Sequence, residues 1–105
     1  MPLTRDFKDT VAKRAQTDVA FRSAMLSEAV DLLLGAETAA AKKMLRDYIN
    51  ATIGFEELAR LTGLPTKSIM RMVGKAGNPR AENLFAVLSA LQQATGVQLE
   101  VKAAA

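Results

Sequence analysis

The amino-acid sequence predicts a mostly α-helical chain of five to six helices with a short β-strand near its C-terminal end. Three observations carry this prediction. Apolar residues recur at spacings of three and four over most of the chain, which is typical of helices that bury one side. Glycines follow several of these segments where a helix would end. Only residues 97–101 alternate apolar and polar side chains with the period of a strand.

Composition limits the possible classes of protein. A chain of 105 residues, half of them hydrophobic and 24% charged, fits a single helical domain with its own core. It has no cysteine and no histidine, which excludes disulfides, zinc fingers and the commonest general base, so no metal or cofactor is expected. The start MPLTRDFKDTV is unlike a signal peptide, and no apolar run is long enough for a membrane span. We expect a cytoplasmic protein without a membrane partner.

The first half of the chain is expected to form supporting helices. Residues 1–15 predict a short amphipathic helix with Thr4 as its candidate N-cap. Residues 18–53 predict two further helices. The first of these starts at Asp18 and stops at Gly35. Its buried stripe is expected to consist of Phe21, Met25, Leu26, Ala29, Leu32 and Leu33.

The second supporting helix runs from about Glu37 to Thr52. Its charged side is expected to face water and comprises Lys42, Lys43, Arg46 and Asp47. Its apolar side is expected to face the core and comprises Ala40, Met44, Leu45, Tyr48 and Ile49. Tyr48 is interpreted as a core tyrosine whose hydroxyl reaches water.

Residues 55–73 follow Gly54 and have the pattern of a helix-turn-helix. Two helices that cross steeply need a small side chain where their backbones approach, and Ala59 provides it. The turn needs a residue that tolerates positive φ, and Gly63 provides it. Pro65 is expected to start the second helix because its φ is already set. The residues that pack the two helices together are then Leu58, Ala59, Gly63, Leu64, Ile69 and Met72.

The basic residues are unevenly distributed. The first fifty residues hold eight Lys or Arg against seven Asp or Glu, whereas residues 66–80 hold four cations and no acid. A phosphate backbone could use such an excess, although a solvated helix face would give the same pattern. These cations are Lys67, Arg71, Lys75 and Arg80.

The last helix is expected over residues 79–95 and ends before Gly96. Asn78 could cap a helix whose first residue is Pro79, and the free N–H groups near Arg80 would then suit an anion such as a phosphate. A plain capping motif explains the same residues equally well. Its buried side is expected to comprise Leu84, Val87, Leu88 and Leu91.

The strand at 97–101 carries Val97, Leu99 and Val101 on one face. A lone strand cannot satisfy its own edges, so it is expected to pair with its equivalent in a second subunit or with a strand of another protein. In a homodimer, this pairing would also fix the distance between the second helices of the two helix-turn-helix motifs. If those helices entered DNA, the distance would be about one turn of the duplex. A segment folded back on its own core, or a disordered end, is the alternative.

Several of these stretches resemble a known family. Residues 55–91 resemble the helix-turn-helix of the phage-repressor/Cro-like (XRE) superfamily, and residues 17–101 are similar to the small bacterial addiction-module antidotes, the HigA-like antitoxins. Three pieces carry the closer resemblance: the helix start Thr17–Phe21, the core Leu58–Leu64, and Gly77–Arg80 followed by Leu84–Leu91. The Gly-Asn-Pro sequence in the third piece is the most distinctive.

This resemblance implies a lambda-repressor-like fold and a dimeric repressor that binds double-stranded operator DNA, commonly of its own operon. It also implies a partner toxin, typically a small ribonuclease of RelE-like type. The second helix of the motif would enter the major groove and read bases through Thr66, Lys67 and Arg71. Phosphates would be contacted by Ser68, Lys75, Asn78 and Arg80.

The sequence departs from the family pattern at two positions. Phe55 stands where many such repressors have a polar residue that touches phosphate, and Pro65 stands where a serine is common. A stand-alone repressor and a protein-interaction module that does not use DNA therefore remain alternatives. An enzyme is not expected, because the neighbouring Glu56 and Glu57 point to different helix faces and nothing flanks them as nucleophile or base.

Overall fold

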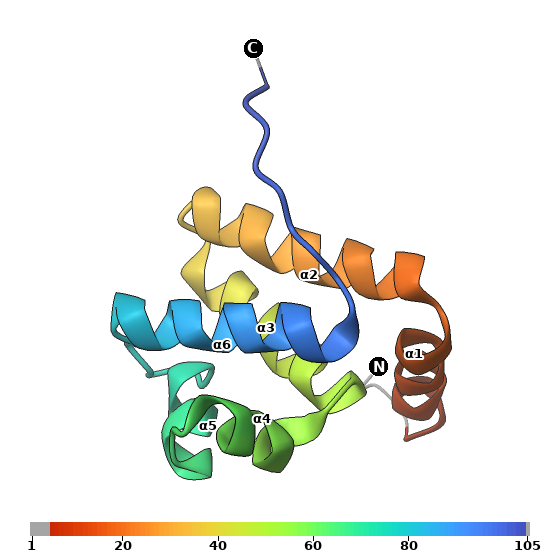
Figure 1. The fold of residues 1–105 in the computed structure, drawn as a ribbon, viewed down its shortest axis with the longest axis horizontal. Helices are drawn as coiled ribbons and strands as arrows, with labels where there is room; N and C mark the ends of the chain where they lie inside the picture. The colour runs from red at the N-terminus through yellow and green to blue at the C-terminus, as the bar shows by residue number, and fades with distance from the viewer. Residues whose placement is uncertain (1–4, 105) are drawn as a thin grey trace.

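The computed structural model describes residues 5–104, and helices dominate this range (Figure 1). The described residues form six helices: α1 Arg5–Thr17, α2 Val19–Leu34, α3 Thr38–Ala51, α4 Gly54–Thr62, α5 Thr66–Met72 and α6 Ala81–Thr95. The prediction of a mostly helical chain with five to six helices is thus confirmed for this range. The expected cap Thr4 lies outside the described residues, and the first helix extends to Thr17 rather than to residue 15.

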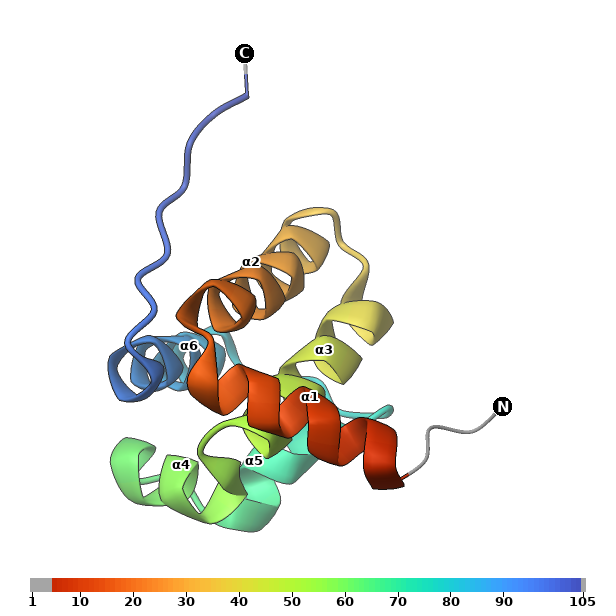
Figure 2. The same cartoon turned by 90° about the vertical axis from the view of Figure 1, so that its right-hand side faces the viewer.

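The helices enclose one core. In Figure 1, α2 and α6 run across the molecule while α4 and α5 lie on the side away from α2. Figure 2 shows α1 lying across the end of this arrangement, where it packs on α2 and α3. The largest side chains that are fully buried come from α2 to α6 and from the residue after α5: Tyr48, Leu26, Leu45, Ile49, Leu58, Ile69, Leu91, Val73 and Val87. No helix in the described range has both the length and the apolar character that crossing a membrane requires.

Helix α2 begins and ends close to the predicted residues. The side chain of Asp18 accepts a hydrogen bond from the Phe21 N–H at 3.2 Å, so the predicted cap is confirmed. The helix ends at Gly35, but the left-handed residue is Ala36 with φ 60°. Bonds from the Ala36 N–H to Leu33 O and from the Glu37 N–H to Leu32 O complete a Schellman motif. Gly35 therefore lies one position before Ala36, the residue whose left-handed conformation would favour a glycine.

The hydroxyl of Tyr48 does not reach water, contrary to the prediction. Tyr48 is fully buried, and its Oη lies 2.6 Å from Thr95 Oγ1 at the end of α6. The Thr95 hydroxyl in turn donates to Leu91 O at 2.6 Å. Burial raises the pKa of the Tyr48 phenol, while the bond with Thr95 and the charge of Arg22 act in the opposite direction. The phenol thus fastens α3 to α6 inside the core.

Arg22 joins the two ends of the helical region. Its Nε donates to Thr95 O at 3.0 Å, and its Nη1 donates to Ala15 O at 2.9 Å and Gln16 O at 3.2 Å. These carbonyls belong to the last turns of α1 and α6, where backbone acceptors lack partners within the helix. One guanidinium therefore completes the hydrogen bonding of two helix ends that are far apart in the sequence.

Helix α6 starts later than predicted. Its first residue is Ala81, and Arg80 occupies the N-cap in an extended conformation (φ −69°, ψ 147°) without a side-chain cap bond. Asn78 and Pro79 belong to the preceding loop, so the expected cap by Asn78 is wrong. The chain uses these residues to span the distance from α5 to α6. At the other end, Gly96 takes the left-handed conformation and stops the helix as predicted.

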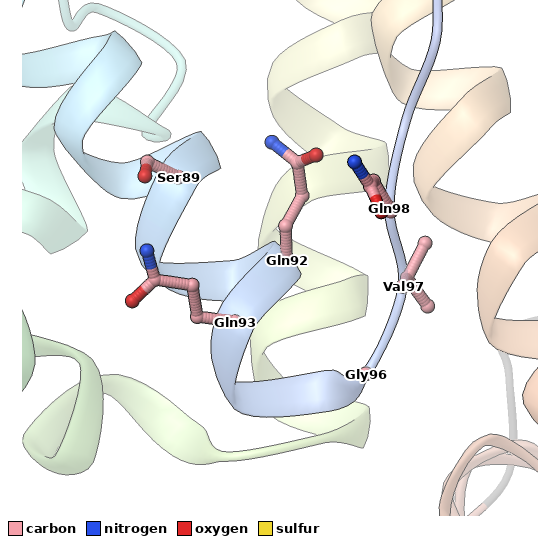
Figure 3. Close-up of a pocket in the computed structure, with 6 residues that line it drawn as sticks. All are labelled: Ser89, Gln92, Gln93, Gly96, Val97 and Gln98. Carbon is pink, nitrogen blue, oxygen red and sulfur yellow. The ribbon is translucent and has the colours of Figure 1, made fainter.

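The predicted strand at 97–101 is absent from the described residues, because no second strand lies beside it. The tail instead leaves α6 and runs past α2 as an extended segment (Figure 1). Val97 is buried, whereas Val101 is 81% exposed. Gln92 holds the start of the tail: its carbonyl accepts from the Val97 N–H at 3.1 Å and its Oε1 from the Leu99 N–H at 2.9 Å. Figure 3 shows the Gln92 side chain rising from α6 beside the tail.

Candidate nucleic-acid interface

Helices α4 and α5 are joined by a tight turn where the sequence predicts one. Gly63 ends α4 with φ 75°, and its N–H donates to Ala59 O at 2.9 Å. The Leu64 N–H donates to the Thr62 hydroxyl at 3.2 Å, which closes the turn. Leu58 and Ile69 are fully buried beneath the turn. Ala59 and Leu64 are half-buried against the core, and Met72 is 8% exposed.

Helix α5 presents its outer face to solvent. Pro65 is its N-cap rather than its first residue, and the Pro65 carbonyl accepts from the N–H groups of Ser68 and Ile69. Among the predicted DNA contacts, Lys67 and Arg71 are exposed, while Thr66 and Ser68 are half-buried. Lys67 and Arg71 are four residues apart and so share a helix face.

A shallow hollow of about 490 Å³ separates α5 from the start of α6. Four predicted DNA contacts line it, two from α5 and two from the loop before α6: Ser68, Arg71, Asn78 and Arg80. The other lining residues are Met72, Gly77, Pro79 and Asn83. Guanidinium, amide and hydroxyl donors dominate this set, and the first turn of α6 adds the positive end of a helix dipole. The hollow is therefore suited to an anion such as phosphate.

The exposed cations around this hollow are not neutralised by the protein itself. They are the four predicted cations of residues 66–80, and each is exposed. Within residues 5–104 none of them forms an ion pair. The ion pairs there instead involve Arg14 with Asp18, Lys43 with Asp47, and Arg60 with Glu57. Lys67 and Lys75 do not line the hollow and lie on α5 and in the loop after it.

The loop between α5 and α6 is held in place from α3, which the sequence did not predict. Lys42 Nζ donates to the Gly77 carbonyl, and Arg46 Nη1 donates to the Val73 carbonyl at 2.8 Å. Both side chains are half-buried rather than solvated, which corrects the prediction that they face water. The reason lies in the phase of α3: Ala41 is buried and Ala40 exposed, so the helix turns its basic residues toward α5.

The two glutamates at the start of α4 form no paired site. Glu57 accepts bonds from the Arg60 guanidinium on the surface, and the bond from Arg60 lowers the pKa of its carboxyl. Glu56 is exposed to solvent. Phe55 is half-buried and packs against the core.

Two residues near the interface were missed by the sequence reasoning. Met70 is 51% exposed on α5, one turn after Thr66, and Asn83 lines the hollow from α6. Helical spacing could have identified Met70, since residues 66 and 70 share a face. Asn83 could not be identified without knowing where α6 begins.

A second hollow of about 480 Å³ lies beside the tail and is lined by no charged residue (Figure 3).

Comparisons with models of known protein families, with curated proteins and with solved structures gave no match. The interface is therefore interpreted from its own geometry and chemistry.

Proposed function

We propose that this chain is a sequence-specific regulator that binds double-stranded operator DNA through a lambda-repressor-like arrangement of its helices. The observation that carries the proposal is a set of four exposed cations in an acid-free segment beside a donor-rich hollow, none of which forms an ion pair within residues 5–104. DNA presents closely spaced phosphates, so cations without an internal partner on one segment favour binding to its backbone.

Helix α5 is proposed as the element that enters the major groove. Lys67 and Arg71 would meet guanine O6 and N7, the commonest specific contact of basic side chains. Thr66 and the exposed Met70 lie one turn apart and would offer methyl groups to thymine. The α4–α5 turn would fix the orientation of this face, as a helix-turn-helix requires.

The hollow and the loop are proposed to bind the DNA backbone. Ser68, Asn78 and Arg80 surround the hollow, so a phosphate seated there would meet a hydroxyl, an amide and a guanidinium. Lys75 lies in the loop after α5 and would contact a neighbouring phosphate. These contacts position the protein on DNA without selecting its sequence.

A homodimer is proposed to form through the C-terminal tail. The N–H groups of Val97 and Leu99 both face Gln92, so in an extended chain those of Gln98 and Glu100 face the opposite side. A second copy could pair with that outer edge and complete the strand predicted at 97–101. Pairing would set two copies of α5 at the spacing of successive major grooves.

The antitoxin role is proposed from the resemblance of residues 17–101 to addiction-module antidotes. It implies repression of the protein's own operon and neutralisation of a RelE-like toxin. A stand-alone repressor would share the DNA interface without the toxin. A module that binds proteins and not DNA is favoured by the exposed Phe85, which is 64% accessible on α6. A small basic reading frame beside the gene would distinguish the antitoxin from the stand-alone repressor.

Titration of labelled DNA from upstream of the gene tests the proposal, with a scrambled duplex of the same length as control. Lys75 and Arg80 in two protomers would neutralise four phosphates, so the affinity should fall with salt with a logarithmic slope of about −4. The upstream duplex should bind at least about a thousandfold more tightly than the scrambled one. An affinity indifferent to both salt and sequence would refute the regulator.

A further inference from the structure

We infer that Lys42 and Arg46 of α3 are positioning residues for the DNA interface, which they shape through the α5–α6 loop without contacting DNA. The inference rests on the proposed function. Lys42 and Arg46 are four residues apart, so one face of α3 carries both. They bind two carbonyls of the same loop, at Val73 and at Gly77.

Arg46 holds the beginning of this loop. Val73 is the C-cap of α5, and carbonyls at a helix C-terminus lack partners within the helix. The Arg46 guanidinium satisfies the Val73 carbonyl at 2.8 Å and brings a positive charge to the negative end of the α5 dipole. It therefore stabilises both the end of the recognition helix and the direction in which the chain leaves it.

Lys42 holds the middle of the loop, where the backbone lies against α5. A Cβ atom built on Gly77 would lie 1.8 Å from Arg71 O, so any other residue there would displace the backbone. The Gly77 N–H donates to Gly74 O at 3.1 Å. With Lys42 bound to its carbonyl, Gly77 is held by hydrogen bonds at both its N–H and its C=O.

The position of this loop sets the distance between the residues proposed to read bases and those proposed to bind phosphate. Asn78 follows Gly77 directly, Arg80 lies three residues after it, and both line the hollow together with Arg71. Arg71 reads bases in the proposed function, while Arg80 binds phosphate. Because bases and phosphates have a fixed separation in DNA, a loop that moves relative to α5 would prevent the two contacts from forming together.

Lys42 and Arg46 are distinguished from direct contacts by their surroundings. Both are half-buried, and neither lines the hollow. Lys43 is the matched control, because it is the next residue, carries the same charge, and pairs with Asp47 on the exposed side of α3. Lys67 is the control for a direct DNA contact, since it is exposed on α5.

The test compares Lys42→Met, Arg46→Met, Lys43→Met and Lys67→Met in two measurements. Amide hydrogen exchange of the free protein reports on the loop through the Gly77 N–H. Binding of the upstream duplex reports on the interface. Lys42→Met and Arg46→Met should speed exchange at Gly77 at least about tenfold and weaken DNA binding at least about tenfold. Lys43→Met should change neither by more than about twofold, and Lys67→Met should weaken binding alone.

Lys42→Arg keeps a donor at the same place, so it should retain the protection of Gly77 even if Lys42→Met unfolds. Unchanged exchange in both Met variants would overturn the inference, as would equal losses of DNA affinity in Lys42→Met and Lys43→Met. If Lys42→Met and Arg46→Met speed exchange at Gly77 but the unmodified protein binds no DNA, the proposed function is refuted. The positioning role for a DNA interface would then be refuted with it. The two failures are thus distinguishable.

Discussion

The buried pair Tyr48 and Thr95 predicts an unequal response to the loss of each partner. A hydroxyl has one proton, and that of Thr95 is committed to Leu91 O, which can only accept. Tyr48 must therefore donate to Thr95 Oγ1 across their 2.6 Å separation. Tyr48→Phe removes the donor and leaves Thr95 with its own bond intact. Thr95→Val removes the acceptor and leaves a buried phenol proton without a partner.

The expected magnitudes follow from this asymmetry. Tyr48→Phe loses one ordinary hydrogen bond and should lower the free energy of unfolding by about 1 kcal/mol. Thr95→Val should lower it by about 2–3 kcal/mol, because the phenol remains desolvated without an acceptor. Replacing both Tyr48 and Thr95 leaves no buried hydroxyl without a hydrogen-bond partner. The double variant should therefore be no less stable than Thr95→Val alone.

Urea denaturation followed by far-UV circular dichroism measures these differences, since the chain has no tryptophan to report by fluorescence. The denaturant slope should stay constant across the four proteins, so that the midpoints report stability directly. A Tyr48→Phe variant less stable than Thr95→Val would contradict the assigned direction of the bond. Additive losses in the double variant would show that the two groups are not coupled.

Four further outcomes are expected. Because burial raises the pKa of Tyr48 above its ordinary value of 10.0, the free energy of unfolding should be insensitive to this group below about pH 10. Above that pH it should fall by up to about 1.4 kcal/mol per pH unit, a loss absent from Tyr48→Phe in parallel urea titrations. Arg71→Ala should weaken binding of the upstream duplex by about 1–3 kcal/mol and relax base preference, whereas an equal loss on all sequences would make Arg71 a phosphate contact. Glu100→Pro removes an outward N–H and should dissociate the proposed dimer in sedimentation equilibrium, while Val101→Pro removes an inward one and should not. A dimer that survives both substitutions would place the interface elsewhere. Ala36→Gly should raise the free energy of unfolding by about 1 kcal/mol because φ at this position is 60°, and Ala24→Gly within α2 should lower it by a similar amount.

The sequence predicted those features whose cause lies within a few residues. The cap at Asp18 and the left-handed turn at Gly63 depend on bonds to residues three or four positions away. Spacing of apolar residues likewise placed Leu58 and Ile69 in the core. The stop predicted at Gly35 is found there, but the left-handed conformation that completes the helix end belongs to Ala36, one residue later.

Features that depend on distant partners could not be predicted. Lys42 and Tyr48 have partners 35 and 47 residues away, whereas the sequence alone predicts contact with water for both. The cap expected at Asn78 failed because the loop remains extended through Arg80, a conformation that follows from its path between α5 and α6. The strand at 97–101 was expected from its alternation alone, yet alternation does not supply a second strand.

Arg22 and Tyr48 both form hydrogen bonds with Thr95, which has a consequence for the order in which the chain can fold during synthesis. Both residues belong to the first half of the chain, which leaves the ribosome before α6 exists. Until residue 95 follows, the Tyr48 phenol has no acceptor from α6, and Arg22 can complete only its bonds at the end of α1. Closure of the core therefore waits for the last helix, and a nascent chain truncated before Thr95 should remain a target for chaperones and proteases.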